Sequence, residues 1–240
     1  MRVVLAWLMA LLLGGATWAQ GAPLRPDLPS ADQPPRRVPT TGYTLALSWA
    51  PEYCHGGRGD RARAPECRDH QTASGFTLHG LWPDGDGANR WPQYCHPVAL
   101  LTEAQMAPVR DVTPSPQLRQ HEWAKHGSCM TDDPARYFAE EAKLFRGIVL
   151  PDMRTLTRRR DLNAGDVARA FAEANPGMRP NMVRLNVNRR GWLEEVWVCL
   201  GLDKRPRPCV AAAGGATPGM PVRIEGMAYA RTPYRRTYRQ

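Results

Sequence analysis

Apolar and polar residues alternate in four stretches of this chain, and each alternation predicts a β-strand. The stretches are residues 43–49 (YTLALSW), 75–81 (GFTLHGL), 183–187 (VRLNV) and 192–199 (WLEEVWVC). We expect Ala50 and Pro51 to end the first strand, and Pro83 with the glycines after it to end the second. The sequence NRRG between the last two predicts a turn, and so an antiparallel hairpin.

The second strand carries a histidine near its end. Alternation puts His79 on the same face as Thr77 and Leu81, opposite Phe76, Leu78 and the glycine that follows the histidine. That glycine leaves room for a ligand to approach. A single histidine at such a place is more often a buried structural residue than a catalyst. It therefore gains a functional interpretation only from the residues that accompany it.

Helical periodicity fills the middle of the chain. One helix is expected to begin after Ser115, which can cap it, with Pro116 at its first position and Gly127 able to end it. Other helices are expected at residues 98–109, from Asp133 through Phe145, and at residues 166–174. Strands early, helices in the middle and a late hairpin predict an α+β class: one domain with a central, mainly antiparallel sheet flanked by helices.

The two ends of the chain differ from this pattern. Residues 1–19 hold one arginine, an apolar run and small residues, which predicts a secretory signal peptide cleaved after Ala19. The run is shorter than the ~20 residues of a membrane anchor, the alternative. We expect a flexible leader at 20–40, one folded domain at 41–230 and a basic tail at 231–240. The protein is then exported, periplasmic or extracellular, monomeric and free of the membrane once the signal is removed.

The chain is basic. Its formal net charge of +9 becomes +8 when Arg2 leaves with the signal. An exported basic protein favours polyanionic partners such as nucleic acid or anionic surfaces, although positive charge can also serve solubility alone. The run at residues 158–160 (RRR) is interpreted as a solvated surface.

Cysteine usage agrees with export. Six cysteines form an even set, which predicts three disulfides among 15 possible pairings: Cys54, Cys67, Cys95, Cys129, Cys199 and Cys209. Cys54 and Cys67 are expected to form a local link across a loop at residues 54–71. A zinc site is the rival interpretation, but the chain has no C-x-x-C or short Cys/His ligand pair.

Titratable residues concentrate in residues 121–129 (HEWAKHGSC). At about 100° per residue, and with His121 at zero, Lys125 lies near 40°, Glu122 near 100° and His126 near 140° on a helix. All four share an arc narrower than half the helix, while Trp123 and its alanine neighbour face the opposite side, toward a core. Such a cluster indicates acid–base chemistry on an anion.

Residues 79–83 (HGLWP) and residues 121–129 (HEWAKHGSC) resemble, in order, the two signatures of the ribonuclease T2 family, H-G-L-W-P and H-E-W-x-K-H-G-T/S-C. These two motifs taken together indicate that the anion is an RNA phosphodiester. The resemblance spans residues 41–210. It implies pairing of Cys95 with Cys129 and of Cys199 with Cys209.

The resemblance also implies a reaction and its residues. The family cleaves single-stranded RNA without metal or cofactor: the ribose 2′-hydroxyl attacks phosphorus, a 2′,3′-cyclic phosphate forms, and water opens it to a 3′-phosphate. His126 would act as base and His79 as acid, since histidine suits both tasks near neutral pH. Lys125 and His121 would offset charge on the phosphoryl oxygens, and Glu122 would orient His126 or hydrogen-bond the phosphorane.

Other residues receive weaker assignments. Trp82 and Asp84 are expected to contact a base by stacking and hydrogen bonding, unless they are a core tryptophan and a turn aspartate. The family often has aromatic residues where this chain has Arg119 and Gln120, and an extra residue separates Trp49 from the next proline. Both departures bear on the base pockets. The histidines outside the motifs, His55, His70 and His96, are interpreted as surface residues.

Two rival functions remain. A zinc hydrolase with H-E-x-x-H needs a histidine where this chain has Lys125, and a separation of five residues between His121 and His126 suits chelation poorly. A secreted basic protein that binds RNA without cutting it is the second. The intact histidines of both motifs argue against that interpretation.

Overall fold

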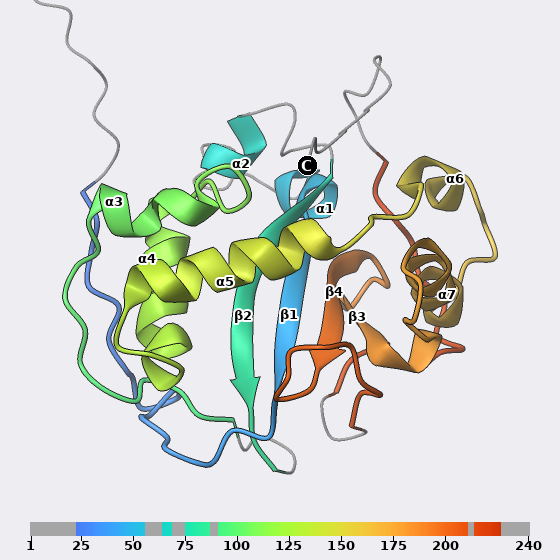
Figure 1. Ribbon diagram of the computed structural model, residues 1–240. Coiled ribbons are helices and arrows are strands. Elements are labelled where there is room, and N and C mark those ends of the chain that lie inside the picture. Colours follow the sequence, from blue (N-terminus) through green and yellow to red (C-terminus); the bar gives the residue numbers. More distant parts are fainter. Residues whose placement is uncertain (1–22, 56–63, 69–74, 87–90, 211–213, 227–240) are drawn as a thin grey trace, which may run out of the picture.

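A computed structural model describes residues 23–55, 64–68, 75–86, 91–210 and 214–226. Four strands form one antiparallel sheet in the order β2-β1-β4-β3, which confirms the predicted α+β class (Figure 1). The strands are β1 Gly42–Trp49, β2 Phe76–Asp84, β3 Val183–Val187 and β4 Leu193–Leu200. The α-helices are α1 Ala50–His55, α2 Pro65–Arg68, α3 Glu103–Met106, α4 Pro116–Lys125, α5 Pro134–Gly147, α6 Met153–Thr157 and α7 Ala164–Ala174.

The hydrophobic core lies between one face of the sheet and the helices α5 and α7. Figure 1 shows α5 crossing in front of β1 and β2. Side chains from β1 such as Leu45 and Leu47 pack there with Phe138 of α5 and Phe171 of α7, all buried. The opposite face of the sheet carries polar and aromatic side chains, and that face holds the candidate site.

Strand β2 is longer than predicted. It continues through Pro83 to Asp84, so the prediction that this proline ends the strand is wrong. β2 is an edge strand, and an edge tolerates a residue without an N–H group. Its outer edge is covered nearby: the Leu78 N–H donates to the carbonyl of Val112 at 2.9 Å, and the Leu78 carbonyl accepts from the Thr113 hydroxyl at 2.8 Å.

A bulge interrupts the pairing of β2 with β1. Ala46 pairs with Gly80 and Leu47 pairs with Leu78, so His79 has no partner on β1. The extra residue resets the alternation after it. Leu81 therefore joins the core face, and the prediction that it shares a face with His79 is wrong. Bulges of this kind re-aim side chains beside functional sites.

Helical structure differs from the prediction in several places, among them α6, which was not expected, and α7, which begins two residues before the predicted start. Short helices α1 and α2 occupy part of the predicted loop after β1. The helix expected at residues 98–109 begins only at Glu103, because Thr102 forms a capping box with Gln105. A 3-10 turn, Ala107–Val109, completes it. The main prediction is confirmed: α4 begins after Ser115, whose hydroxyl accepts from the Leu118 N–H at 3.3 Å.

Three disulfides link the described residues as expected: Cys54–Cys67, Cys95–Cys129 and Cys199–Cys209. The leader residues 23–40 run beside α4 and make specific contacts with it. The predicted signal peptide and basic tail lie outside the described residues. Among the residues described, no helix has the length and apolar composition that crossing a membrane requires.

Candidate active site

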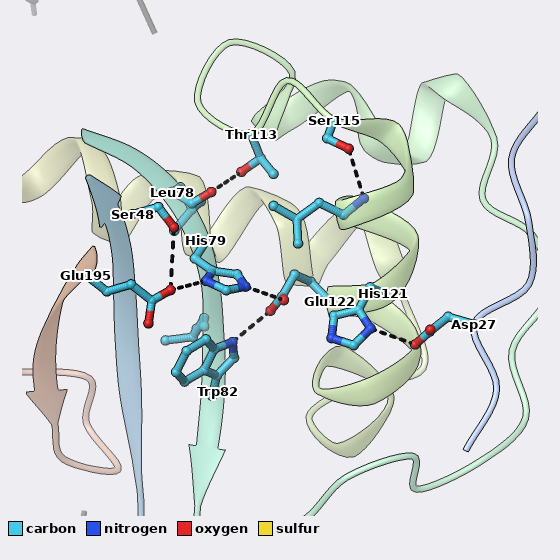
Figure 2. Close-up of polar contacts among 12 residues, drawn as sticks. Asp27, Ser48, Leu78, His79, Trp82, Thr113, Ser115, His121, Glu122 and Glu195 are labelled. Carbon is cyan, nitrogen blue, oxygen red and sulfur yellow. Dashed lines mark hydrogen bonds and ion pairs between the residues drawn. The ribbon is translucent and has the colours of Figure 1, made fainter. Parts of the chain in front are cut away.

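His79 is anchored from the sheet side by Glu195 of β4. The carboxylate of Glu195 accepts a hydrogen bond from Nδ1 of His79 (Figure 2). Ser48 of β1 and Asn186 of β3 lie directly opposite Glu195 in the sheet register and donate to the same carboxylate at 3.5 and 3.3 Å. Trp197 adds a bond from its Nε1 at 2.9 Å. Four donors therefore fix this carboxylate in place.

Glu122 of α4 approaches His79 from the other side. Its Oε1 lies 3.4 Å from Nε2 of His79, and its Oε2 accepts from Nε1 of Trp82 at 2.8 Å. The Glu122 side chain is only 1% exposed. A Cβ on Gly80 would collide with the Glu122 carboxylate, so the glycine beside His79 permits this close approach.

The two carboxylates set the charge of His79. Burial by itself lowers the pKa of this histidine, but Glu122 and Glu195 together outweigh burial and raise the pKa to about 9. Burial also raises the pKa of Glu122, while His79 and His121 oppose that change. At neutral pH the imidazole of His79 therefore carries a proton that it can donate.

His126 is in the opposite electrostatic situation. It caps the C-terminal end of α4 and is 5% exposed, with its ring stacked on Trp82 at a centroid distance of 5.4 Å. Burial, followed by the positive charges of Lys125, His121 and His79, holds the pKa of His126 well below its usual value of 6.5. At neutral pH this ring is neutral and can accept a proton.

The remaining titratable residues of α4 lie around this pair. The ring of His121 is 6.5 Å from that of His126 and donates through Nδ1 to Asp27 of the leader at 2.9 Å. Lys125 acts electrostatically on His79, Glu122 and His126. The predicted arc on α4 therefore faces β2, and Trp123 is buried on the opposite side.

Trp82 lies at the centre of the cluster. Its ring stacks on His126, meets His79 edge-on at 5.2 Å and meets Trp197 edge-on at 5.9 Å. Its indole N–H is occupied by Glu122. Trp82 thus contacts both histidines and holds the carboxylate that pairs with one of them, in addition to any face that it offers a base.

Asp84 lies two residues further along β2 in a different environment. Its carboxylate accepts from the Thr44 hydroxyl at 3.0 and 3.2 Å. Burial raises the pKa of Asp84, while Thr44 and the charge of Arg207 oppose the rise. No contact among the described residues joins Asp84 to the histidines.

Arg119 and Gln120 brace loops. Arg119 is buried and donates to the carbonyls of Thr113 and Pro114, both at 2.7 Å. The Gln120 amide bonds the main chain of Leu101 and Ala99. Thr113 in turn hydrogen-bonds Leu78 of β2. Arg119, which stands where the family often has an aromatic residue, therefore supports through Thr113 the edge of β2 beside His79.

The two described histidines outside the motifs lie apart from the site. His55 is 66% exposed and pairs with Glu225 at 3.2 Å, and His96 lies 3.4 Å from Asp132. His70 falls outside the described residues. Within the described ranges, no three His, Cys, Asp or Glu side chains gather so as to hold a metal ion.

Comparison with known proteins identifies the architecture. The model of the ribonuclease T2 family matches residues 41–209, which include both histidine motifs. The chain belongs to the ribonuclease T2 family. Among its T2 relatives, a "Probable ribonuclease" of Haemophilus influenzae is 28% identical over 173 residues, 68% of this chain and 58% of that protein. A "Ribonuclease" of Aeromonas hydrophila is 29% identical over 167 residues, 67% of this chain and 72% of that protein.

Solved structures share the T2 fold. The S-like ribonuclease trichomaglin superposes with a TM-score of 0.59 at 20% identity, covering 77% of this chain and 98% of that one. An RNase-related protein from Calystegia sepium gives a TM-score of 0.58 at 17% identity, with 79% and 98% covered. The matched region spans a little over half the length of the Haemophilus relative.

Sequence reasoning missed two carboxylates of this T2 site. Glu195 lies in a strand whose alternation was visible, yet only the register of β1 between β2 and β4 brings it to His79. Asp27 lies in the leader, where no periodic pattern points to a partner. Both contact the Nδ1 atom of a histidine.

Proposed function

We propose that this chain is a metal-independent endoribonuclease that cleaves single-stranded RNA by attack of the 2′-hydroxyl on the adjacent phosphorus. One observation carries the proposal: two histidines that both contact the ring of Trp82 have opposite pKa shifts. His126 is neutral and His79 is protonated at neutral pH. One base and one acid on different elements suit a displacement at phosphorus.

In the first step, Nε2 or Nδ1 of His126 takes the proton of the 2′-hydroxyl as the 2′-oxygen bonds to phosphorus. The bond from phosphorus to the 5′-oxygen breaks, and His79 gives its proton to the departing oxygen. The products are a 2′,3′-cyclic phosphate and a free 5′-hydroxyl. In the second step, His79 takes a proton from water as the water oxygen bonds to phosphorus. The bond from phosphorus to the 2′-oxygen breaks, and His126 returns a proton to that oxygen, which leaves a 3′-phosphate and a free 2′-hydroxyl.

Negative charge builds on the phosphoryl oxygens during both steps. Lys125 and His121 lie on the same arc of α4 as His126 and can offset that charge. Glu122, buried and bonded by Trp82, holds the His79 imidazolium in place. Trp82 and Asp84 remain our candidates for contact with a base. Of the two, Trp82 has an aromatic ring on which a base can stack, and that ring contacts both histidines.

Relatives support the substrate class. The structure of a mutant of RNase MC1 in complex with 5′-UMP, which superposes with a TM-score of 0.52, shows that a protein of this fold holds a nucleotide. Three disulfides are typical of proteins folded in an oxidising compartment, so we propose that the protein is exported. We further propose that it acts as a monomer.

The test is an assay on a defined single-stranded ribo-oligonucleotide with product analysis. We expect a 2′,3′-cyclic phosphate that converts to a 3′-phosphate. An oligonucleotide with deoxyribose at the cleavage position should stay intact, since it lacks the nucleophile. Binding of RNA without cleavage between pH 4 and 8 would instead support the non-enzymatic RNA-binding function.

A further inference from the structure

The leader is attached to the body of the protein on both sides of Asp27. Before it, the main-chain N–H and carbonyl of Arg25 both bond the Gln117 side chain of α4 at 3.0 Å. After it, Arg36 forms an antiparallel bridge with Gln93, with N–O distances of 2.8 and 2.9 Å. The Arg37 guanidinium donates to the carbonyl of Cys95 at 2.6 Å. These contacts fix the path of the leader past α4.

Asp27 lies between these attachments and faces His121. Its Oδ2 accepts from Nδ1 of His121 at 2.9 Å and from the hydroxyl of Tyr94 at 3.0 Å. The Asp27 side chain is 23% exposed, and Tyr94 is buried. Burial and the neighbouring carboxylate raise the pKa of Tyr94, so its hydroxyl stays protonated and remains a donor.

Tyr94 is itself built into the end of α4. Its main-chain N–H donates to the carbonyl of Lys125 at 2.8 Å, and it adopts a φ of 48°. The next residue, Cys95, forms a disulfide with Cys129. A left-handed conformation is uncommon for a tyrosine, and the surrounding bonds maintain it. The support of Asp27 is thus connected to the same helix end that carries His126.

The direction of the His121 ring follows from this contact. Asp27 lies on the side of His121 away from Glu122 and His79, as Figure 2 shows. With Nδ1 donating to the carboxylate, the other ring nitrogen, Nε2, is left for a ligand. A carboxylate bound to the outer nitrogen of a histidine fixes the orientation of the ring, and a proton on Nε2 then makes that atom a donor toward an anion.

We propose that Asp27 is a positioning residue of the active site, and that the leader supplies it. Asp27 holds His121 so that an Nε2–H of this ring can donate to the phosphoryl oxygens of RNA, while Tyr94 holds Asp27. The proposal rests on the proposed ribonuclease function and extends the site beyond the residues matched by the family model. The prolines of the leader, including Pro26, restrict its backbone and lower the entropy lost when it docks.

The test measures kcat and KM on a defined ribodinucleotide for Asp27→Ala, His121→Ala and the double variant. We expect Asp27→Ala to lower kcat about tenfold, the size of one charge-assisted hydrogen bond, with little change in KM. In the His121→Ala background the same change should cost nothing further, because Asp27 acts through His121. Losses that multiply, or a rise in activity on removing Asp27, would overturn the proposal.

Conservative variants and a spectroscopic signature separate positioning from folding. Asp27→Glu should recover part of the lost kcat, and Tyr94→Phe should reproduce a fraction of the loss. Asp32→Asn removes one exposed carboxylate from the same segment and should leave kcat unchanged. A protected Nδ1–H signal of His121 is expected in nitrogen-15 spectra of the wild type and should vanish in Asp27→Ala, whose Tm should stay near wild type.

The same assays distinguish failure of the proposed ribonuclease function from failure of the positioning role of Asp27. If the wild type leaves RNA uncut, the proposed function fails whatever the leader does. If the wild type cuts RNA and Asp27→Ala matches it in kcat, only the positioning role fails.

Discussion

Glu195 on β4 accepts a hydrogen bond from His79 on β2, although β1 lies between those strands. The contact is possible because His79 lies on the same face of the sheet as Ser48 and Glu195, opposite Leu78, and because glutamate is long enough to span the intervening strand. Nε2 of the same ring faces Glu122 at 3.4 Å. The His79 imidazolium is therefore bounded by a carboxylate at each nitrogen, which suits a residue that must hold a proton and release it.

Removal of either histidine should abolish efficient cleavage. We expect His79→Ala and His126→Ala each to lower kcat on single-stranded RNA by at least ~10²-fold, because each loses one proton transfer. His55→Ala is the matched control, since His55 is 66% exposed and remote from the cluster. Near-normal turnover in either of the first two variants would refute the role assigned to that histidine.

The dependence of kcat/KM on pH should be bell-shaped with a wide plateau. The acid side falls when His126 becomes protonated, and its pKa lies well below 6.5, so this limb should appear only at acid pH. The alkaline side falls as His79 loses its proton near pH 9. Because the two groups interact, the limbs report the pair as a whole.

Substitution of Glu195 should move one limb of that profile. Glu195→Gln removes a negative charge that raises the pKa of His79, so the alkaline limb should shift to lower pH while the acid limb stays in place. Glu194→Gln is the control, because the neighbouring glutamate is exposed. An unchanged alkaline limb in Glu195→Gln would show that this carboxylate does not raise the pKa of His79.

The position of Gly80 should not tolerate even the methyl group of alanine. An added Cβ meets the Glu122 carboxylate, so Gly80→Ala should lower the free energy of unfolding by about 1–3 kcal/mol and reduce activity by displacing Glu122. At Gly75, just before the same strand, a Cβ meets no atom within 4 Å. Gly75→Ala should therefore change stability by no more than about 0.5 kcal/mol. Equal behaviour of the two alanine variants in chemical unfolding would contradict the steric argument.

The indole nitrogen of Trp82 can be tested separately from its ring. Trp82→Phe keeps an aromatic ring but leaves the buried Glu122 without one donor, a loss of about 1.5–3 kcal/mol for a bond to a charged group. We expect lower kcat and lower Tm. Trp91→Phe removes a comparable indole bond, to Gln93 at 3.0 Å outside the cluster, and should leave kcat unchanged.

Excess chelator should leave the rate unchanged. The proposed reaction uses proton transfer and positively charged side chains in place of a metal ion. The assay compares initial rates on RNA with and without a chelator of divalent cations. Loss of activity that added zinc restores would return the metallohydrolase hypothesis to consideration.

The sequence predicted the parts of this fold that local patterns encode. Helix α4 shows this best, because Ser115, Pro116 and the buried Trp123 each act within one element. The strands and the hairpin were equally visible in the alternation. His79 and His126 were predicted to share one site, but only the resemblance of their two motifs to the signatures of a known family supported that prediction.

The parts that sequence reasoning missed depend on contacts between distant segments. The bulge in β2 arises from pairing with β1, and Pro83 is tolerated because β2 is at the edge of the sheet. Glu195 and Asp27 reach their histidines across 116 and 94 residues of chain. No local periodicity encodes such pairings.

The Cys95–Cys129 disulfide has a consequence for when the protein becomes competent. It joins the segment that bears Tyr94 to the chain three residues after His126. The residue that holds Asp27 and the end of the helix that carries His126 are therefore connected by one covalent bond. A chain still inside a reducing cytoplasm would lack that link, and its site would be incompletely ordered. If the protein is exported and cleaves RNA as proposed, RNA in the compartment of synthesis would be spared until the thiols are oxidised.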